Sequence, residues 1–257
     1  MKKLSNSFTD IHSHALWGLD DGAGSIQESV ELCAMAAENG TSDLFLTPHL
    51  MYWENADDLF DERNLKFERL EEIIYEEGIG LKLHKGFEIL CDDDIFNIKY
   101  FKPYTLGDSR YILIEFDFFK TVLEDVVSWT DYLKSYGLVP IIAHPERYDF
   151  LLSDRDGVDI LSEKGNLFQL NSGSAAGMFG DEVRDFAEEM INRGYADFMG
   201  SDAHDLVMRN TDMAFCFDSY SEEINIDMLE RAISINPLKL LKDEQIKPQR
   251  LCYFDEN

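Results

Sequence analysis

The stretch that decides the fold is YILIEFDFFKTVLEDVVSWTDYLKSYGLVPIIAH, residues 111–144. It opens with an apolar run at 112–114, continues through a helical segment at 123–136 that Gly137 follows, and closes on a second apolar run at 140–142. Strands that are apolar nearly throughout are typical of a parallel sheet buried on both faces, and glycine is favoured directly after a helix. The stretch therefore predicts one β-α-β unit.

Short β-rich runs and longer helical runs alternate in the same way along the rest of the chain. Ser25 and Glu28 have the spacing of a capping box at the start of the first helical run, and Gly40 stands where its C-cap is expected. Further helices are predicted over 57–77, 123–136 and 181–193. Strands are predicted over 8–12, 43–49, 81–89, 111–116, 138–144, 166–171 and 195–202. Because no linker or repeat divides the chain, we expect one domain over residues 1–257, built as a parallel α/β barrel.

The charge of the chain limits its partners. There are 257 residues with 23 Lys and Arg against 51 Asp and Glu, a formal charge of −28. Such a charge repels nucleic acid and anionic membranes unless metal ions reverse the potential locally. No stretch approaches about 18 uninterrupted apolar residues, so we expect no stable membrane insertion.

The four cysteines give no sign of a disulfide framework or a thiolate metal site. Cys33, Cys91, Cys216 and Cys252 are widely spaced, and none forms a Cys-x-x-Cys pair. Reduced thiols are typical of the cytoplasm, which is where we expect the protein to be.

Metal-competent side chains gather where the predicted strands end. In a parallel barrel these ends meet at one mouth, where the chemistry of such folds lies. His12 and His14 are two residues apart, so on a strand they point to the same side and can hold one ion. Imidazole and carboxylate donors without a thiolate favour Mn, Fe or Zn. In chain order the polar strand-end residues are Asp10, His12, His14, His49, Glu88, Glu115, His144, Asn171, Asp202 and His204, and His84, inside a strand, is the one histidine left out.

Taken together and in order, these segments resemble the polymerase and histidinol phosphatase (PHP) superfamily. The matching segments are DIHSHALWGLDDGAGSIQESV, LTPHL, GFEI, DSRYILIEF, IIAHPERYD, FQLNSGS and GSDAH, and they extend from about residue 9 to residue 241. Within the superfamily the chain is most similar to the manganese-dependent bacterial protein-tyrosine phosphatases that regulate capsular and exopolysaccharide synthesis. The resemblance implies a distorted (β/α)7 TIM-like barrel with three divalent ions, of which manganese is the first expectation and iron or zinc the alternatives.

The resemblance also implies which residues hold the ions. One ion would be held by His12, His14, Glu88 and Asp202. Glu88 would bridge to a second ion that Glu115 and His144 complete. The third would be held by Asp21, His49 and His204. Asp20 is adjacent to Asp21, and the residues alone leave the choice between them open, whereas the family pattern favours Asp21.

The expected reaction is hydrolysis of a phosphomonoester. Four carboxylates and three divalent ions would leave the filled site near a charge of about +2, which suits a phosphate dianion. Arg147 and Arg209 lie three and five residues beyond His144 and His204, and their side chains can form bidentate bonds to phosphoryl oxygens. No cysteine has an arginine six positions later, so a cysteinyl-phosphate route is unsupported. We expect a metal-bridging hydroxide to attack phosphotyrosine on a bacterial tyrosine kinase or another protein that controls capsule synthesis.

Three other functions fit parts of the sequence. A small-molecule phosphatase of the histidinol-phosphatase type would use much the same ligands. A nuclease of the polymerase-associated branch is disfavoured by the charge of −28. A non-catalytic, metal-stabilised regulator that binds a kinase would be favoured by the loss of a ligand, and all nine ligands are present. The sequence leaves the oligomeric state and the acid that protonates the leaving group open.

Overall fold

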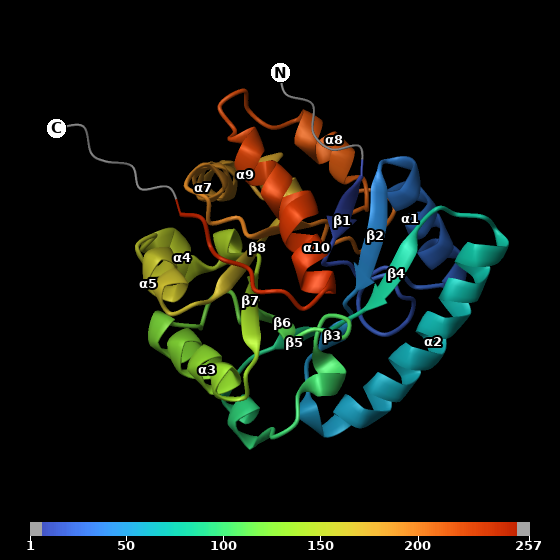
Figure 1. Cartoon of the computed structure of the whole chain (residues 1–257), viewed down its shortest axis with the longest axis horizontal. Coiled ribbons are helices and arrows are strands. Elements are labelled where there is room, and N and C mark those ends of the chain that lie inside the picture. The colour runs from blue at the N-terminus through green and yellow to red at the C-terminus, as the bar shows by residue number, and fades with distance from the viewer. Residues whose placement is uncertain (1–6, 251–257) are drawn as a thin grey trace.

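The computed structural model describes residues 7–250, and it consists of parallel strands surrounded by helices (Figure 1). One sheet has the order β1 (Phe8–Asp10), β2 (Thr41–Leu46), β4 (Lys82–Lys85). The other has the order β3 (His49–Leu50), β5 (Glu88–Leu90), β6 (Tyr111–Glu115), β7 (Val139–Ala143), β8 (Leu167–Asn171), β9 (Phe198–Gly200). Each neighbouring pair is parallel. The predicted parallel α/β class is confirmed.

The prediction of continuous strands over 43–49 and 81–89 is wrong, because each run breaks into two short strands. Pro48 lacks the N–H that a continuous ladder needs, and a Cβ at Gly86 would lie 2.7 Å from a methyl group of Leu106. The two segments nevertheless stay paired through the break, since Gly86 N donates to Leu46 O (3.0 Å) and Glu88 N donates to Pro48 O (3.1 Å). They bend together and pass from one sheet to the other.

The first and last strands are shorter than predicted, and the chain beyond them joins the two sheets. β1 stops at Asp10 instead of residue 12, and β9 covers 198–200 instead of 195–202. Past these ends, Asp202 N donates to His12 O and His14 N donates to Ala203 O, both at 2.8 Å. The sheets thus curl around a shared interior as a partial barrel, filled by Ile11, Phe45, Leu113, Ile141 and Phe198 among others.

Helices cover the outside of the sheets (Figure 1). The predicted helices are α1 (Ile26–Glu38), α2 (Ala56–Glu76), α3 (Leu123–Ser135) and α7 (Asp181–Asn192), each within about two residues of its predicted bounds and each followed by a glycine with positive φ. Of the predicted capping box, Ser25 Oγ accepts from Glu28 N, whereas the Glu28 carboxylate accepts from Gly24 N. The shorter helices are α4 (Asp149–Ser153), α5 (Gly157–Glu163), α6 (Ser172–Ala175), α8 (Met213–Asp218), α9 (Ile226–Glu230) and α10 (Asn236–Leu241).

The segment after α10 covers the amino-terminal ends of the strands. Asp243 accepts from the backbone N–H of Arg110 (2.8 Å), and the Tyr111 hydroxyl donates to Glu244 O (2.6 Å). Ile246 is buried in the barrel interior beside Leu113 and Ile141. With this end occupied by the chain itself, the opposite end is left for a site.

Within residues 7–250, no helix is long and apolar enough to cross a membrane. Cys33, Cys91 and Cys216 are buried and form no disulfide with one another, and Cys252 lies outside the described residues.

Candidate metal centre

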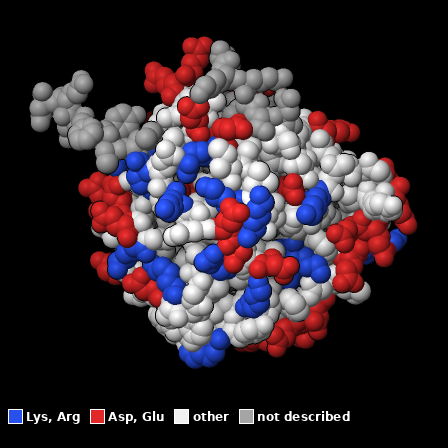
Figure 2. Space-filling view, in the orientation of Figure 1, with Lys and Arg blue, Asp and Glu red and all other residues white. Residues whose placement is uncertain are grey.

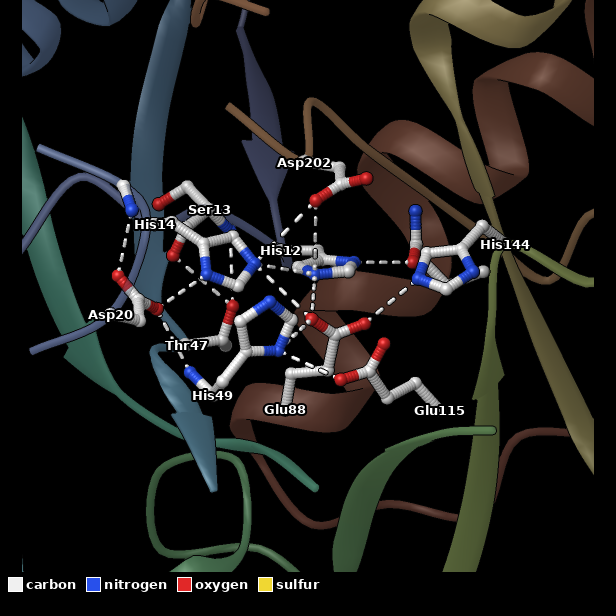
Figure 3. Close-up of polar contacts among 12 residues, drawn as sticks. His12, Ser13, His14, Asp20, Thr47, His49, Glu88, Glu115, His144 and Asp202 are labelled. Atoms are coloured by element: carbon white, nitrogen blue, oxygen red, sulfur yellow. Dashed lines mark hydrogen bonds and ion pairs between the residues drawn. The ribbon is translucent and has the colours of Figure 1, made fainter. Parts of the chain in front are cut away.

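The carboxyl-terminal side of the partial barrel brings together side chains that are far apart in the sequence (Figure 3). His12 and His14 follow β1, Glu115 ends β6, His144 follows β7, and Asp202 and His204 follow β9. Asp21 comes from the loop before α1. His49 and Glu88 do not end strands as predicted, since they begin β3 and β5 just past the bend.

Glu88 lies at the middle of this cluster and is fully buried. Its Oε2 atom lies 3.1 Å from His12 Nε2, 3.2 Å from His14 Nε2 and 3.1 Å from His49 Nδ1. Its Oε1 atom lies 2.9 Å from His144 Nε2. One carboxylate therefore faces four imidazoles, and the charge of His12 with the close contacts of His12, His14 and His144 outweighs burial and holds the pKa of Glu88 well below its usual value.

The donor atoms fall into three overlapping groups, within each of which they lie no more than 4.8 Å apart. The first group is His12, His14, Glu88 and Asp202, the same four residues that the resemblance assigns to one ion. The second is His49, Glu88 and Glu115, and the third is His14, Asp21, His49 and His204. His144 contacts Glu88 but belongs to none of the groups, whereas His14 and His49 each belong to two.

Several donors in the cluster are buried without a suitable hydrogen bond. Glu88 Oε2 and His49 Nδ1 are both inaccessible, and neither makes a hydrogen bond of acceptable geometry although they lie 3.1 Å apart. His12 Nε2 and His14 Nε2 lie 3.2 Å apart, so at most one of the two can donate a proton to the other. Buried polar atoms normally have partners, and lone pairs directed at a common point are what a metal ion requires. The residues present therefore fit divalent cations.

Asp20 and Asp21, which the residues alone left undecided, differ in their surroundings. The Asp20 carboxylate is buried, lies 2.6 Å from His14 Nδ1, and accepts from Gly22 N and His49 N. The Asp21 side chain is 71 % exposed and lies 3.4 Å from His204 Nε2 and 3.5 Å from His49 Nε2. Asp20 thus orients an imidazole from behind, while Asp21 faces the cluster.

The Asp20 contact also sets the charge state of His14 in the metal-free protein. Burial alone lowers the pKa of His14, but the hydrogen bond with Asp20 and the close contact with Glu88 outweigh it and raise this pKa to about 9. The pKa of Asp20 falls to about 2, because the bond and charge of His14 outweigh its burial. Burial and the neighbouring His14 lower the pKa of His204 to about 4.

Gln169 is a positioning residue that the sequence argument missed. Its Oε1 lies 2.7 Å from His12 Nδ1, and its Nε2 donates to Asn171 Oδ1 (3.0 Å). Asn171 Nδ2 in turn donates to Asp202 Oδ2 (2.6 Å). Gln169 and Asn171 are two residues apart on β8, so their side chains lie on the same face of the strand. This spacing is visible in the sequence and could have identified Gln169. The two amides fix the orientation of two members of the first group.

The two arginines singled out in the sequence meet at Asp202. Arg209 Nη2 lies 2.6 Å and Arg147 Nη1 lies 3.2 Å from the same oxygen, Asp202 Oδ2. The Arg147 guanidinium is also held between the rings of Phe118 and Phe179, with centroids 4.7 and 4.3 Å away. Both guanidinium groups are thus fixed at the edge of the cluster and remain partly exposed.

A parallel α/β partial barrel with an imidazole and carboxylate cluster at its strand ends defines a class, the metal-dependent proteins of TIM-like architecture. The family model described as "Capsular polysaccharide synthesis, CpsB/CapC" matches residues 8–242, and the chain belongs to this family. The resemblance stated from the sequence is therefore confirmed.

Relatives agree with this assignment. CapC of Staphylococcus aureus is 31 % identical over 245 residues, which cover 93 % of each chain. A crystal structure from work on YwqE from Bacillus subtilis and CpsB from Streptococcus pneumoniae, described as unique metal-dependent tyrosine phosphatases, matches with a TM-score of 0.80 at 28 % identity, covering 95 % of this chain and 99 % of that one. An amidohydrolase from Mycoplasma synoviae matches with a TM-score of 0.59 at 10 % identity, covering 91 % and 87 %, and shows likeness of fold alone.

Proposed function

We propose that this chain is a metal-dependent protein-tyrosine phosphatase. The observation that carries the proposal is the buried Glu88, shared by two overlapping groups of metal-competent donors, with two guanidinium groups at the edge of the same cluster. Overlapping donor groups suit closely spaced ions, and such sites are typical of enzymes that hydrolyse phosphate esters. The description of the relatives as metal-dependent tyrosine phosphatases supports the same activity.

We assign three divalent ions, with manganese first among them. His12, His14, Glu88 and Asp202 would hold the first ion. Glu88, Glu115 and His144 would hold the second, to which the geometry adds His49. Asp21, His49 and His204 would hold the third, to which it adds His14. When bound, the ions would lower the pKa of water and offset charge on the phosphoryl oxygens.

The residues around the ions have separate roles in this proposal. Arg147 and Arg209 bind the phosphoryl oxygens in exchange for part of their contact with Asp202, because a guanidinium can bind a phosphate in bidentate fashion. Asp20 and Gln169 hold His14 and His12 in the required ring orientation. Aryl phosphates suit a site without an evident general acid, since the phenol of tyrosine, with a pKa of about 10, leaves readily.

Exposed apolar side chains on the loops that follow the strands support a protein substrate. Tyr52 is 65 % exposed after β3, Phe119 is 79 % exposed after β6, and Met208 is 68 % exposed after β9. Large exposed apolar residues on such loops are typical of surfaces that bind other proteins. We propose a phosphorylated bacterial tyrosine kinase or another phosphoprotein of capsule synthesis as the substrate, in the cytoplasm. We further propose that the partial barrel is a distorted (β/α)7 barrel forming one catalytic domain.

A substrate comparison with the manganese-loaded protein tests this proposal. Phosphate release should be fastest from a phosphotyrosine peptide, slower from a phosphoserine peptide, and slow from histidinol phosphate. A Glu88→Gln variant should be inactive in all three assays, and His84→Gln, outside the cluster, is the matched control. Preference for histidinol phosphate would instead indicate a small-molecule phosphatase, and inactivity on every substrate with full metal content would indicate a kinase-binding regulator.

A further inference from the structure

A second region of interest is a cavity of about 670 Å³ that no residue of the metal cluster lines. Its walls come from α2, β4, the segment from Tyr100 to Asp108, and the end of α10. A volume between about 300 and 1,000 Å³ is typical of sites for small molecules and cofactors. The cavity is therefore large enough for a ligand of nucleotide size.

The charge of this cavity is opposite to that of the protein. Four of its lining residues are cations and two are acids, whereas the whole chain has 23 cations and 51 acids. Figure 2 shows Lys and Arg gathered across the middle of the face seen in Figure 1, with Asp and Glu more frequent toward its edge. The lining cations are Arg63, Lys82, Lys85 and Lys102, and the acids are Glu71 and Asp108.

Arg63 is the most unusual of these cations because it is buried without a carboxylate. Its side chain is 2 % exposed and donates to two neutral carbonyls, those of Gly86 (3.1 Å) and Pro103 (3.3 Å). Its Nε atom is buried without a hydrogen-bond partner, and among residues 7–250 Arg63 forms no ion pair. A buried cation is costly unless it is paired, and here burial lowers its pKa to about 10. The Arg63 guanidinium also lies 5.1 and 4.5 Å from the ring centroids of Phe60 and Phe87, so aromatic faces and carbonyls hold it at the wall of the cavity without a counter-charge.

The three lysines are also weakly compensated. Lys102 Nζ donates to the backbone carbonyl of Asp108 (2.6 Å), and Lys85 Nζ lies 4.0 Å from Glu68, whose side chain is 69 % exposed. Lys82 is exposed and forms no ion pair within the described part of the chain. These ammonium groups remain able to bind an anion.

We propose that this cavity binds a phosphorylated small molecule of nucleotide size. The phosphates would contact Lys82, Lys102 and the Arg63 guanidinium, because cations bind phosphate through short, charge-assisted hydrogen bonds. The ring of Tyr100, which lines the cavity and is 67 % exposed, offers a surface for the flat ring of a base.

Binding there is linked structurally to the metal cluster. Arg63 holds the carbonyl of Gly86, two residues before Glu88, and Gly107 N donates to Lys85 O (2.7 Å) at the end of β4, directly before the bend. A ligand that engages Arg63 therefore acts on the bend that seats Glu88, and we expect it to change kcat/KM on phosphotyrosine. This consequence rests on the proposed function, whereas the binding itself does not.

Calorimetry on the manganese-loaded protein tests the site with three probes: inorganic phosphate, adenosine, and α,β-methylene ADP, which has no cleavable bond between its phosphates. We expect the ADP analogue to bind tightest and adenosine not to bind. In Lys82→Gln/Lys102→Gln its affinity should fall about tenfold or more. The matched control Lys134→Gln/Lys164→Gln removes the same charge outside the cavity and should bind like wild type. If the double variant is unstable, the single variant Lys82→Gln replaces it, and its affinity for the ADP analogue should also fall.

A further variant separates the cavity from the metal cluster. Arg209→Ala should leave the affinity for the ADP analogue unchanged, so loss of binding in that variant alone would place the ligand at the cluster and overturn the proposal. Equal binding by wild type and the cavity variants would also overturn it. Binding that depends on the cavity lysines in an enzyme inactive on every phosphoester would uphold this site and refute the proposed function. Binding with unchanged kcat/KM would remove the link to Glu88.

Discussion

Replacing Glu88 with glutamine tests the centre of the site most directly. The substitution keeps the volume of the side chain and removes its charge, so changes in packing contribute little. In the metal-free protein, Glu88 Oε2 faces imidazole nitrogens of His12, His14 and His49 at 3.1–3.2 Å. In the metal-loaded protein the same carboxylate would be shared by two ions, and the charge of the site would change by one unit.

The size of the effect follows from this shared position. Loss of a partner that only orients a metal ligand typically costs about 10–100-fold in metal affinity or activity. Glu88 belongs to two donor groups as a direct donor, so we expect metal affinity and kcat/KM each to fall by at least about 10²-fold. His84, which bonds to Asp43 at 2.7 Å and belongs to no donor group, should tolerate glutamine with less than about a twofold change in kcat/KM.

The assay combines elemental analysis of the purified variants with kcat/KM on a phosphotyrosine peptide over a manganese titration. A Glu88→Gln variant that keeps three ions and wild-type activity would refute the assignment of Glu88 as the shared ligand. Equal losses in Glu88→Gln and His84→Gln would show that the effect comes from general destabilisation. Partial rescue by high manganese would support weakened binding of the ions.

Three further predictions concern the same site. Removal of metal by a chelator should abolish activity and lower Tm, because ions that bind the native state stabilise it, and scanning calorimetry with and without manganese measures this. Arg147→Ala and Arg209→Ala should keep their metal content but lose about 10²-fold in kcat/KM, and lysine at either position should restore only part of the activity. A change in kcat/KM within about twofold would show that these arginines only form ion pairs with Asp202. In the metal-free protein, His14 has a raised pKa, so its contribution to stability is present below pH 6.5 and is lost as pH rises toward about 9. The lowered pKa of Asp20 acts at the acid end, its contribution being present above pH 3.8 and lost as pH falls toward about 2. Asp20→Asn should therefore flatten the dependence of Tm on pH in both ranges, and a metal-free variant with the wild-type profile would contradict the pairing.

The sequence predicted the parallel class and most of the polar residues that gather at the strand ends because both depend on local signals. Apolar runs mark buried parallel strands, and a histidine or carboxylate at the end of such a run is placed by the strand itself. The bend at Pro48 and Gly86 was missed because its cause is tertiary, in the contact of Gly86 with Leu106. It matters because it places His49 and Glu88 at the start of new strands.

The parts of the site that the sequence left open depend on loop and second-layer contacts. Asp20 and Asp21 are adjacent in one loop, so the sequence alone does not show which of them faces the metal cluster. The structure distinguishes them because Asp20 accepts hydrogen bonds from Gly22 N and His49 N. Gln169 was missed because an amide is not a common metal ligand, although it lies 2.7 Å from His12. Residues that orient ligands are recognised by their contacts, and contacts require the fold.

Two residues of the site have a strained backbone conformation that lowers the stability of the folded protein. His144 and Asp202, at the ends of β7 and β9, have φ values of 35° and 52°, and a non-glycine residue in this region costs about 1–3 kcal/mol. Both are held by backbone hydrogen bonds at 2.8 Å, from His144 N to Gln169 O and from Asp202 N to His12 O. The strain adds to the cost of the buried, unpaired donors. Because glycine at position 144 or 202 would relieve this strain but remove a proposed metal ligand, manganese should raise Tm less in either glycine variant than in wild type and activity should be lost, whereas glycine at a strained strand end outside the site would raise Tm at no cost to activity.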